Sequence, residues 1–129
     1  MIFFNDPIVL PNPAERALRM AMSLHDRVEE LSLLWRNRGH ELSLGIGMSK
    51  GYATIGAIGF EGRLDYGAIG TVTNLASRLC GEAKGGQILT HRKVLSDIED
   101  LIEFDAIGEL HLKGFAKPVA AFDITALKA

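Results

Sequence analysis

The residues best suited to chemistry lie in the segment from Asp65 to Leu79, DYGAIGTVTNLASRL. Asn74 and Arg78 are four residues apart, so on a helix they share one face. Asparagine is a poor residue for the middle of a helix, which makes this one informative. An amide beside a guanidinium offers several hydrogen-bond donors, as an oxyanion or phosphate site requires. The residues alone leave two interpretations open: an anion site, or an exposed helix face with an incidental asparagine.

Two helices and several short strands must position that segment. The spacing of apolar residues predicts a long helix over 13–38, with Asn12 as its N-cap and Gly39 as its stop. A second helix is predicted over 71–83, and it carries Asn74 and Arg78. Alternation predicts a strand over 41–48 that forms a hairpin with a strand over 52–58, followed by a loop over 59–67. The remaining predicted elements are short strands at 87–89 and 102–104, a helix at 91–98 and a closing hairpin over 110–124.

This order of elements predicts an α+β sandwich, in which helices cover one face of a mostly antiparallel sheet. The 129 residues are enough for one domain, and 47% hydrophobic with 23% charged residues is ordinary globular usage. No apolar run reaches the roughly 18 residues that span a membrane. The net charge of −2 argues against a nucleic-acid partner. The single cysteine excludes an internal disulfide and favours a cytoplasmic location.

Other motifs in the chain point to packing rather than chemistry. The four histidines are scattered without the spacing of metal ligands. The glycine-rich segment 45–59 lacks the Gly-Lys-Ser/Thr of a phosphate-binding loop, so we expect its glycines to permit close backbone packing.

With these residues in view, the run from Leu44 to Leu89 resembles the catalytic domain of class III adenylate/guanylate cyclases. The matching pieces are LGIGMSKGYATIGAIG at 44–59, RLDYGAIGTVTNLASRL at 63–79 and AKGGQIL at 83–89. The ending GELHLKGFAKPVAAFDI at 108–124 and the opening FFNDP and PAERALRMA also match. The resemblance implies a ferredoxin-like/nucleotide-cyclase α/β sandwich that is truncated at its N-terminus. Residues 1–129 would then be one partial catalytic domain.

The resemblance also implies an activity and a site. Enzymes of this family convert ATP or GTP into a 3′,5′-cyclic nucleotide and pyrophosphate in signal transduction, at sites between the subunits of a head-to-tail dimer. Asn74 would orient the ribose, and Arg78 would stabilise charge on the α-phosphate. Lys113 would reach the terminal phosphates, although a solvated hairpin lysine is an equally good interpretation. Gly67 falls on a position that reads the purine base.

Two departures from the family pattern limit what this chain can do. The family holds Mg²⁺ or Mn²⁺ with two aspartates, and both positions would lie upstream of Met1. We therefore expect no metal ion bound by this chain, and little or no cyclase activity from it alone. Asp6 is a turn residue and does not replace either aspartate. Gly67 has no side chain with which to hydrogen-bond a purine.

Two function classes remain open. One is a working cyclase whose N-terminal part is missing here, which the presence of Asn74 and Arg78 favours. The alternative is a noncatalytic cyclase-like dimerisation or nucleotide-sensing module, which Gly67 favours. In either case, without the family's first strand, the strands expected at Ile2–Phe4 and 41–48 would flank a gap of one strand or close up on each other. An open strand edge invites pairing, so we expect a homodimer or higher oligomer.

Overall fold

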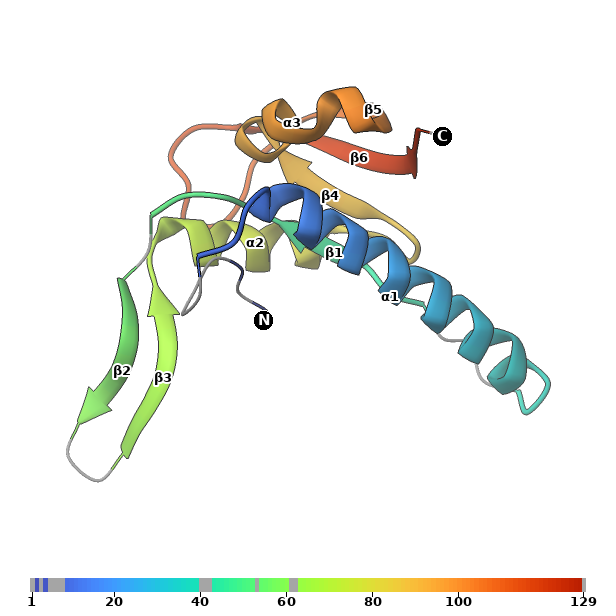
Figure 1. Cartoon of the computed structure of the whole chain (residues 1–129), viewed down its shortest axis with the longest axis horizontal. Helices are drawn as coiled ribbons and strands as arrows, with labels where there is room; N and C mark the ends of the chain where they lie inside the picture. Colours follow the sequence, from blue (N-terminus) through green and yellow to red (C-terminus); the bar gives the residue numbers. More distant parts are fainter. Residues whose placement is uncertain are drawn as a thin grey trace.

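A four-stranded sheet forms the centre of the protein (Figure 1). The computed structural model describes residues 2, 4, 9–39, 43–52, 54–60 and 63–128, with strands 54–60 and 63–69 described by their backbone pairing. The strand order is β1-β4-β6-β5, with bounds β1 Ile46–Met48, β4 Ile88–His91, β5 Ile102–Leu110 and β6 Val119–Leu127. β1 pairs with β4 in parallel, while β4–β6 and β5–β6 are antiparallel. The predicted α+β class and mostly antiparallel pairing are confirmed.

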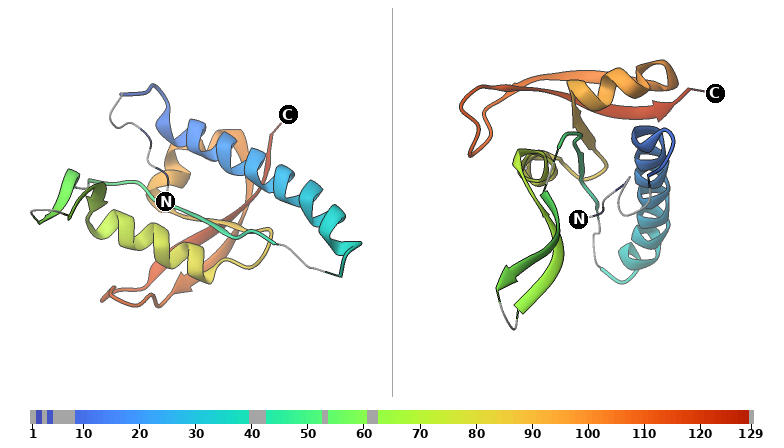
Figure 2. Two further views of the ribbon diagram at one scale, coloured as in Figure 1. Left: turned by 90° about the horizontal axis from the view of Figure 1, so that it is seen from below. Right: turned by 60° about the vertical axis from the view of Figure 1, so that its left-hand side comes forward.

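The helices lie on both faces of this sheet. They are α1 (Pro13–Arg36), α2 (Thr71–Glu82) and α3 (Arg92–Ile98), and a 3-10 turn at Glu99–Leu101 follows α3. Ile88 packs in one apolar cluster with α1 and α3, whereas its neighbour Leu89 packs with α2. Figure 2 accordingly shows α1 and α2 on opposite sides of β1 and β4. This differs from the predicted placement on one face, because successive side chains of a strand point to opposite faces and β4 is apolar on both.

The start of α1 differs from the predicted cap. The helix itself forms close to the predicted bounds, ending at Arg36. Asn12, predicted as the N-cap, adopts a left-handed backbone with φ of 50° and makes no capping side-chain hydrogen bond. Its carbonyl instead accepts the Arg16 N–H at 3.1 Å. Pro13 in the first turn supplies a fixed φ, so the helix begins there without a side-chain cap.

The predicted pairing of the strands after α1 is wrong. β2 (Thr54–Phe60) pairs with β3 (Arg63–Ile69) in an antiparallel hairpin, running from Thr54 opposite Ile69 to Phe60 opposite Arg63. Much of the predicted loop 59–67 is therefore strand, and β1 is not part of the hairpin. The charged and glycine residues of this segment resemble a loop, yet they also alternate with Leu64, Tyr66 and Ala68. The hairpin projects away from the four-stranded sheet (Figure 1).

The edge of the sheet at β1 is open in the part of the chain that is described. There β1 is hydrogen-bonded to β4 on one side and to no described strand on the other. Ile2 and Phe4 do not belong to a strand, contrary to the strand expected at 2–4. Phe3, and Asn5 to Ile8 with the turn expected at Asp6, lie outside the described residues.

Candidate functional site

Two glycines of the first strand region set the position of α2. A Cβ atom on Gly47 would lie 2.3 Å from the Cys80 nitrogen and 2.5 Å from the Ala76 oxygen. A Cβ atom on Gly45 would lie 2.9 Å from the Ala83 oxygen. The strand therefore contacts the helix backbone directly, and any side chain would force the two apart. Close packing by these glycines was predicted, but the partner is helix α2 rather than a second strand.

Helix α2 buries one face and leaves Asn74 and Arg78 on the surface. Leu75 and Leu79 are buried in a cluster with Leu89, Leu112 and Ala121. Asn74 and Arg78 are both exposed, and as residues four apart in a regular helix they lie one turn above each other. Among the described residues, neither side chain has a hydrogen-bond or ion-pair partner. The predicted juxtaposition is confirmed as geometry, and both groups are available to an external ligand.

The first turn of α2 is fixed by hydroxyl groups. The Ser49 hydroxyl, just after β1, donates to the Val72 carbonyl at 2.5 Å. The Thr73 hydroxyl donates to the Gly70 carbonyl at 2.7 Å. Ser49 thus links the end of β1 to the turn that leads to Asn74. Nothing in the local pattern around Ser49 indicates this contact, because its partner is 23 residues away.

Lys113 lies at a turn in the connection between β5 and β6. The Phe115 N–H donates to the Leu112 carbonyl at 3.1 Å, and Gly114 has φ of 90°, which suits the third position of a type II turn. Leu112 is buried in the same cluster as Leu75 and Leu79, while Lys113 is exposed. The three residues of Leu-Lys-Gly therefore have different structural roles. The leucine anchors the turn beneath α2, the glycine permits it, and the lysine is presented to solvent.

Gly67 lies within the projecting hairpin. It pairs with Gly56 in the β2–β3 ladder, ahead of the N-terminus of α2. Among the described residues, no contact joins Gly67 to Asn74, Arg78 or Lys113.

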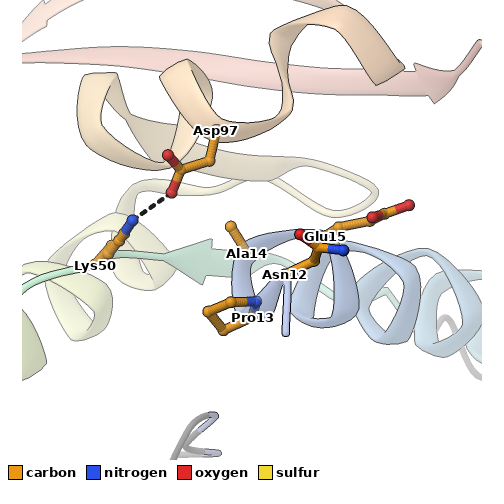
Figure 3. A pocket seen from close by; sticks show the side chains of 6 residues that line it. All are labelled: Asn12, Pro13, Ala14, Glu15, Lys50 and Asp97. Carbon is orange, nitrogen blue, oxygen red and sulfur yellow. Dashed lines mark hydrogen bonds and ion pairs between the residues drawn. The ribbon is translucent and has the colours of Figure 1, made fainter. Parts of the chain in front are cut away.

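The predicted site residues lie outside two hollows of the described surface. Those two hollows have volumes of about 280 and 250 Å³. The first is bounded by the start of α1, Lys50 and Asp97 (Figure 3), and the second by the loop after β1, the start of α2, His91 and Lys93. Neither is lined by any of the four predicted site residues. A nucleotide held by Asn74 and Arg78 would need a second surface to enclose it.

The described residues do not fit the two-metal centre that the resemblance implies. In 9–39, 43–52 and 70–128, no three His, Cys, Asp or Glu side chains gather in a way that could hold a metal ion. No metal-dependent step is therefore assigned to these residues. Among the helices of the described chain, none is both long and apolar enough to span a membrane.

Comparison with known proteins now gives the family. The adenylate and guanylate cyclase catalytic domain matches residues 7–126. Adenylate cyclase 1 of Rhizobium meliloti (strain 1021) is 30% identical over 124 residues, which cover 94% of this chain and 19% of that protein. The adenylyl cyclase CyaB from P. aeruginosa is 34% identical with a TM-score of 0.83, over 94% of this chain and 64% of that one. The guanylyl cyclase Cya2 is 27% identical with a TM-score of 0.87, over 97% of this chain and 64% of that one.

These matches confirm the predicted resemblance and the nucleotide-cyclase α+β fold. This chain spans 19% of the first curated relative and 64% of each of the two solved chains. Because the match covers residues 7–126 and both similar solved structures share the fold, the chain belongs to the adenylate and guanylate cyclase catalytic domain family.

Proposed function

We propose that this chain contributes the Asn74–Arg78 helix face to a cyclase site that forms a 3′,5′-cyclic nucleotide and pyrophosphate from ATP or GTP. The observation that carries the proposal is a pair of exposed side chains on α2 that have no partner among the described residues, on a helix in direct contact with β1. In this reaction the ribose 3′-oxygen attacks the α-phosphorus, and the bond to the leaving pyrophosphate breaks.

Each residue then has a role that follows from its chemistry. The Arg78 guanidinium donates several hydrogen bonds in one plane, so it can stabilise the charge that develops on the α-phosphate. The Asn74 amide can hold the ribose by donating and accepting. Lys113, on its turn beside the same cluster, supplies a positive charge for the leaving phosphates.

We propose that the site is completed by a second copy of the chain, in a homodimer or higher oligomer. An open helix face leaves the nucleotide exposed on one side. An isolated two-stranded hairpin such as β2–β3 is only marginally stable in water, so a partner surface would stabilise it. The edge of β1 that pairs with no described strand offers further backbone hydrogen bonds to a partner.

We propose that this chain does not itself supply the metal-dependent part of the chemistry. In the family, Mg²⁺ or Mn²⁺ activates the attacking hydroxyl and neutralises the triphosphate. We therefore expect residues 1–129, as one partial catalytic domain, to form little or no cyclic nucleotide alone. The proposed setting is signal transduction in the cytoplasm, where a single free cysteine stays reduced.

A second candidate is a noncatalytic dimerisation or nucleotide-sensing module. The observation in its favour is Gly67, which pairs with Gly56 in the hairpin and offers no side chain to a purine. Such a module would still form a dimer but would not form cyclic nucleotide.

The test compares two proteins incubated with Mn²⁺ and either ATP or GTP, with the cyclic nucleotide measured by mass. One is this chain, and the other is a chimera that carries the aspartate-bearing segment of the CyaB catalytic domain fused ahead of Met1. Turnover by the chimera alone supports the proposal. If neither protein turns over but both sediment as dimers, the noncatalytic module is correct. Robust turnover by residues 1–129 alone would contradict the proposal.

A further inference from the structure

Lys50, in the loop after β1, contacts strand β4 and helix α3. The Lys50 backbone N–H donates to Nε2 of His91 at 3.0 Å. The Lys50 Nζ forms an ion pair with Asp97 on α3 at 2.5 Å, which Figure 3 shows at the edge of the first hollow. The preceding residue, Ser49, donates a hydrogen bond from its hydroxyl to the Val72 carbonyl of α2. Two consecutive residues therefore link the end of β1 to β4, α3 and α2.

The contact at His91 depends on the protonation state of its ring. Nε2 can accept the Lys50 N–H only when it carries no proton, so the neutral ring with its proton on Nδ1 is the form that closes the contact. Protonation of Nε2 would leave two N–H donors facing each other with no acceptor between them, and the hydrogen bond would break. The ring is the sole titratable group in this contact, because the other partner is a backbone amide.

The groups around His91 are mostly cationic or neutral. Lys50 and Lys93 carry positive charge, and Asp97 is already paired with Lys50. The Arg92 guanidinium lies over the Phe122 ring at 5.0 Å, and the β6 residue opposite His91 is Ala121.

The α2 residues that share the second hollow with His91 are Thr71, Val72 and Leu75, none of which titrates. Burial of the ring, and then the charge of Lys93, lower the pKa of His91 below its ordinary value. The ring is therefore neutral at pH 7, and the contact is closed there.

We infer that the hydrogen bond between Lys50 and His91 is a proton-operated latch, closed when His91 is neutral and opened when the ring is protonated. Opening frees the loop of residues 49–52 from β4. The Ser49–Val72 hydrogen bond carries that loosening to the first turn of α2, two residues before Asn74. The latch is a property of the fold and does not depend on the proposed cyclase activity.

Amide hydrogen exchange in the whole ¹⁵N-labelled chain tests the latch directly, since Lys50 is itself the donor. Exchange rates are corrected for the intrinsic effect of pH and recorded between pH 7.5 and 5. The protection of the Lys50 amide is expected to fall about tenfold for each pH unit as pH approaches the His91 pKa, because the open fraction follows ring protonation. The Ile46 amide, which donates to the Gln87 carbonyl at 2.9 Å, is the internal control and should not follow this slope.

Two variants complete the test. His91→Gln removes the titrating ring and should abolish the pH dependence at Lys50, whereas His111→Gln, at an exposed histidine in the β5–β6 connection, should preserve it. The inference is overturned if Lys50 and Ile46 share one pH profile, or if the slope survives in His91→Gln. If His91→Gln does not fold, a titration of the wild-type chain still tests the inference. The Lys50 ¹⁵N shift must titrate with the same midpoint as the His91 ring protons, and a different midpoint overturns the latch.

Discussion

Replacing Gly47 by alanine tests whether direct contact between β1 and α2 positions the site. The new Cβ atom would lie 2.3 Å from the Cys80 nitrogen, whereas ordinary contact begins at 3.4 Å. Both close atoms belong to the helix backbone, so no side-chain rotation relieves the clash and the helix must move by about 1 Å. That movement would loosen Leu75 and Leu79 in their cluster. We expect Gly47→Ala to lower the free energy of unfolding by about 1–3 kcal/mol.

The matched control is Gly81→Ala on the same helix. Gly81 is exposed, and a Cβ atom there would meet nothing within 4 Å. Since glycine inside a helix costs about 0.5–1 kcal/mol relative to alanine, this change should stabilise the protein. The assay is urea unfolding followed by circular dichroism at fixed pH. Opposite signs for the two variants support the argument, and a Gly47→Ala protein as stable as wild type would refute it.

Further predictions concern the core, the site and pH. Leu79→Ala should cost about 2–5 kcal/mol in the same urea assay, because Leu79 is fully buried; a loss below 1 kcal/mol would contradict its place in the core. Arg78→Ala should leave the unfolding midpoint unchanged, since the side chain is exposed and unpartnered among the described residues, so a large shift would indicate a structural role. Because the His91 pKa is lowered on folding, its contribution to stability is present above the unfolded pKa of about 6.5 and is lost as pH falls through the lower folded value. Unfolding midpoints of wild type and His91→Gln should therefore converge toward acid pH. Asp97→Asn should cost at most about 1 kcal/mol and less in high salt, because both partners of the ion pair are partly exposed.

Local patterns predicted the helices well, and with them the shared face of Asn74 and Arg78 on α2. The bounds of α1 and α2 agree with the apolar spacing, since α2 buries Leu75 and Leu79 and the first half of α1 buries Ala14, Leu18 and Ala21. The same spacing placed Asn74 and Arg78 on one face, away from Leu75 and Leu79. These features depend on residues within a turn or two of each other, which a sequence displays directly.

Features that depend on distant residues were not predictable. β1 pairs with residues 88–90, some forty positions later, and no pattern within β1 distinguishes that partner from the adjacent strand. The partner of Gly47 is likewise a helix far along the chain. Asn12 is of a residue type common at N-caps, yet its backbone is left-handed and its side chain makes no capping hydrogen bond. Ser49 looked like an ordinary turn residue until the structure placed α2 beside it.

The central claim is that the α2 face performs transition-state chemistry, and Arg78→Ala in the chimera tests it most directly. The measurement is the rate of cyclic nucleotide formation with Mn²⁺ and the preferred nucleotide, with Arg27→Ala as the matched control on the exposed surface of α1. We predict at least about a 100-fold loss for Arg78→Ala, the effect of removing one preorganised donor, and no loss for Arg27→Ala. An Arg78→Ala chimera that retains the full rate would contradict the account.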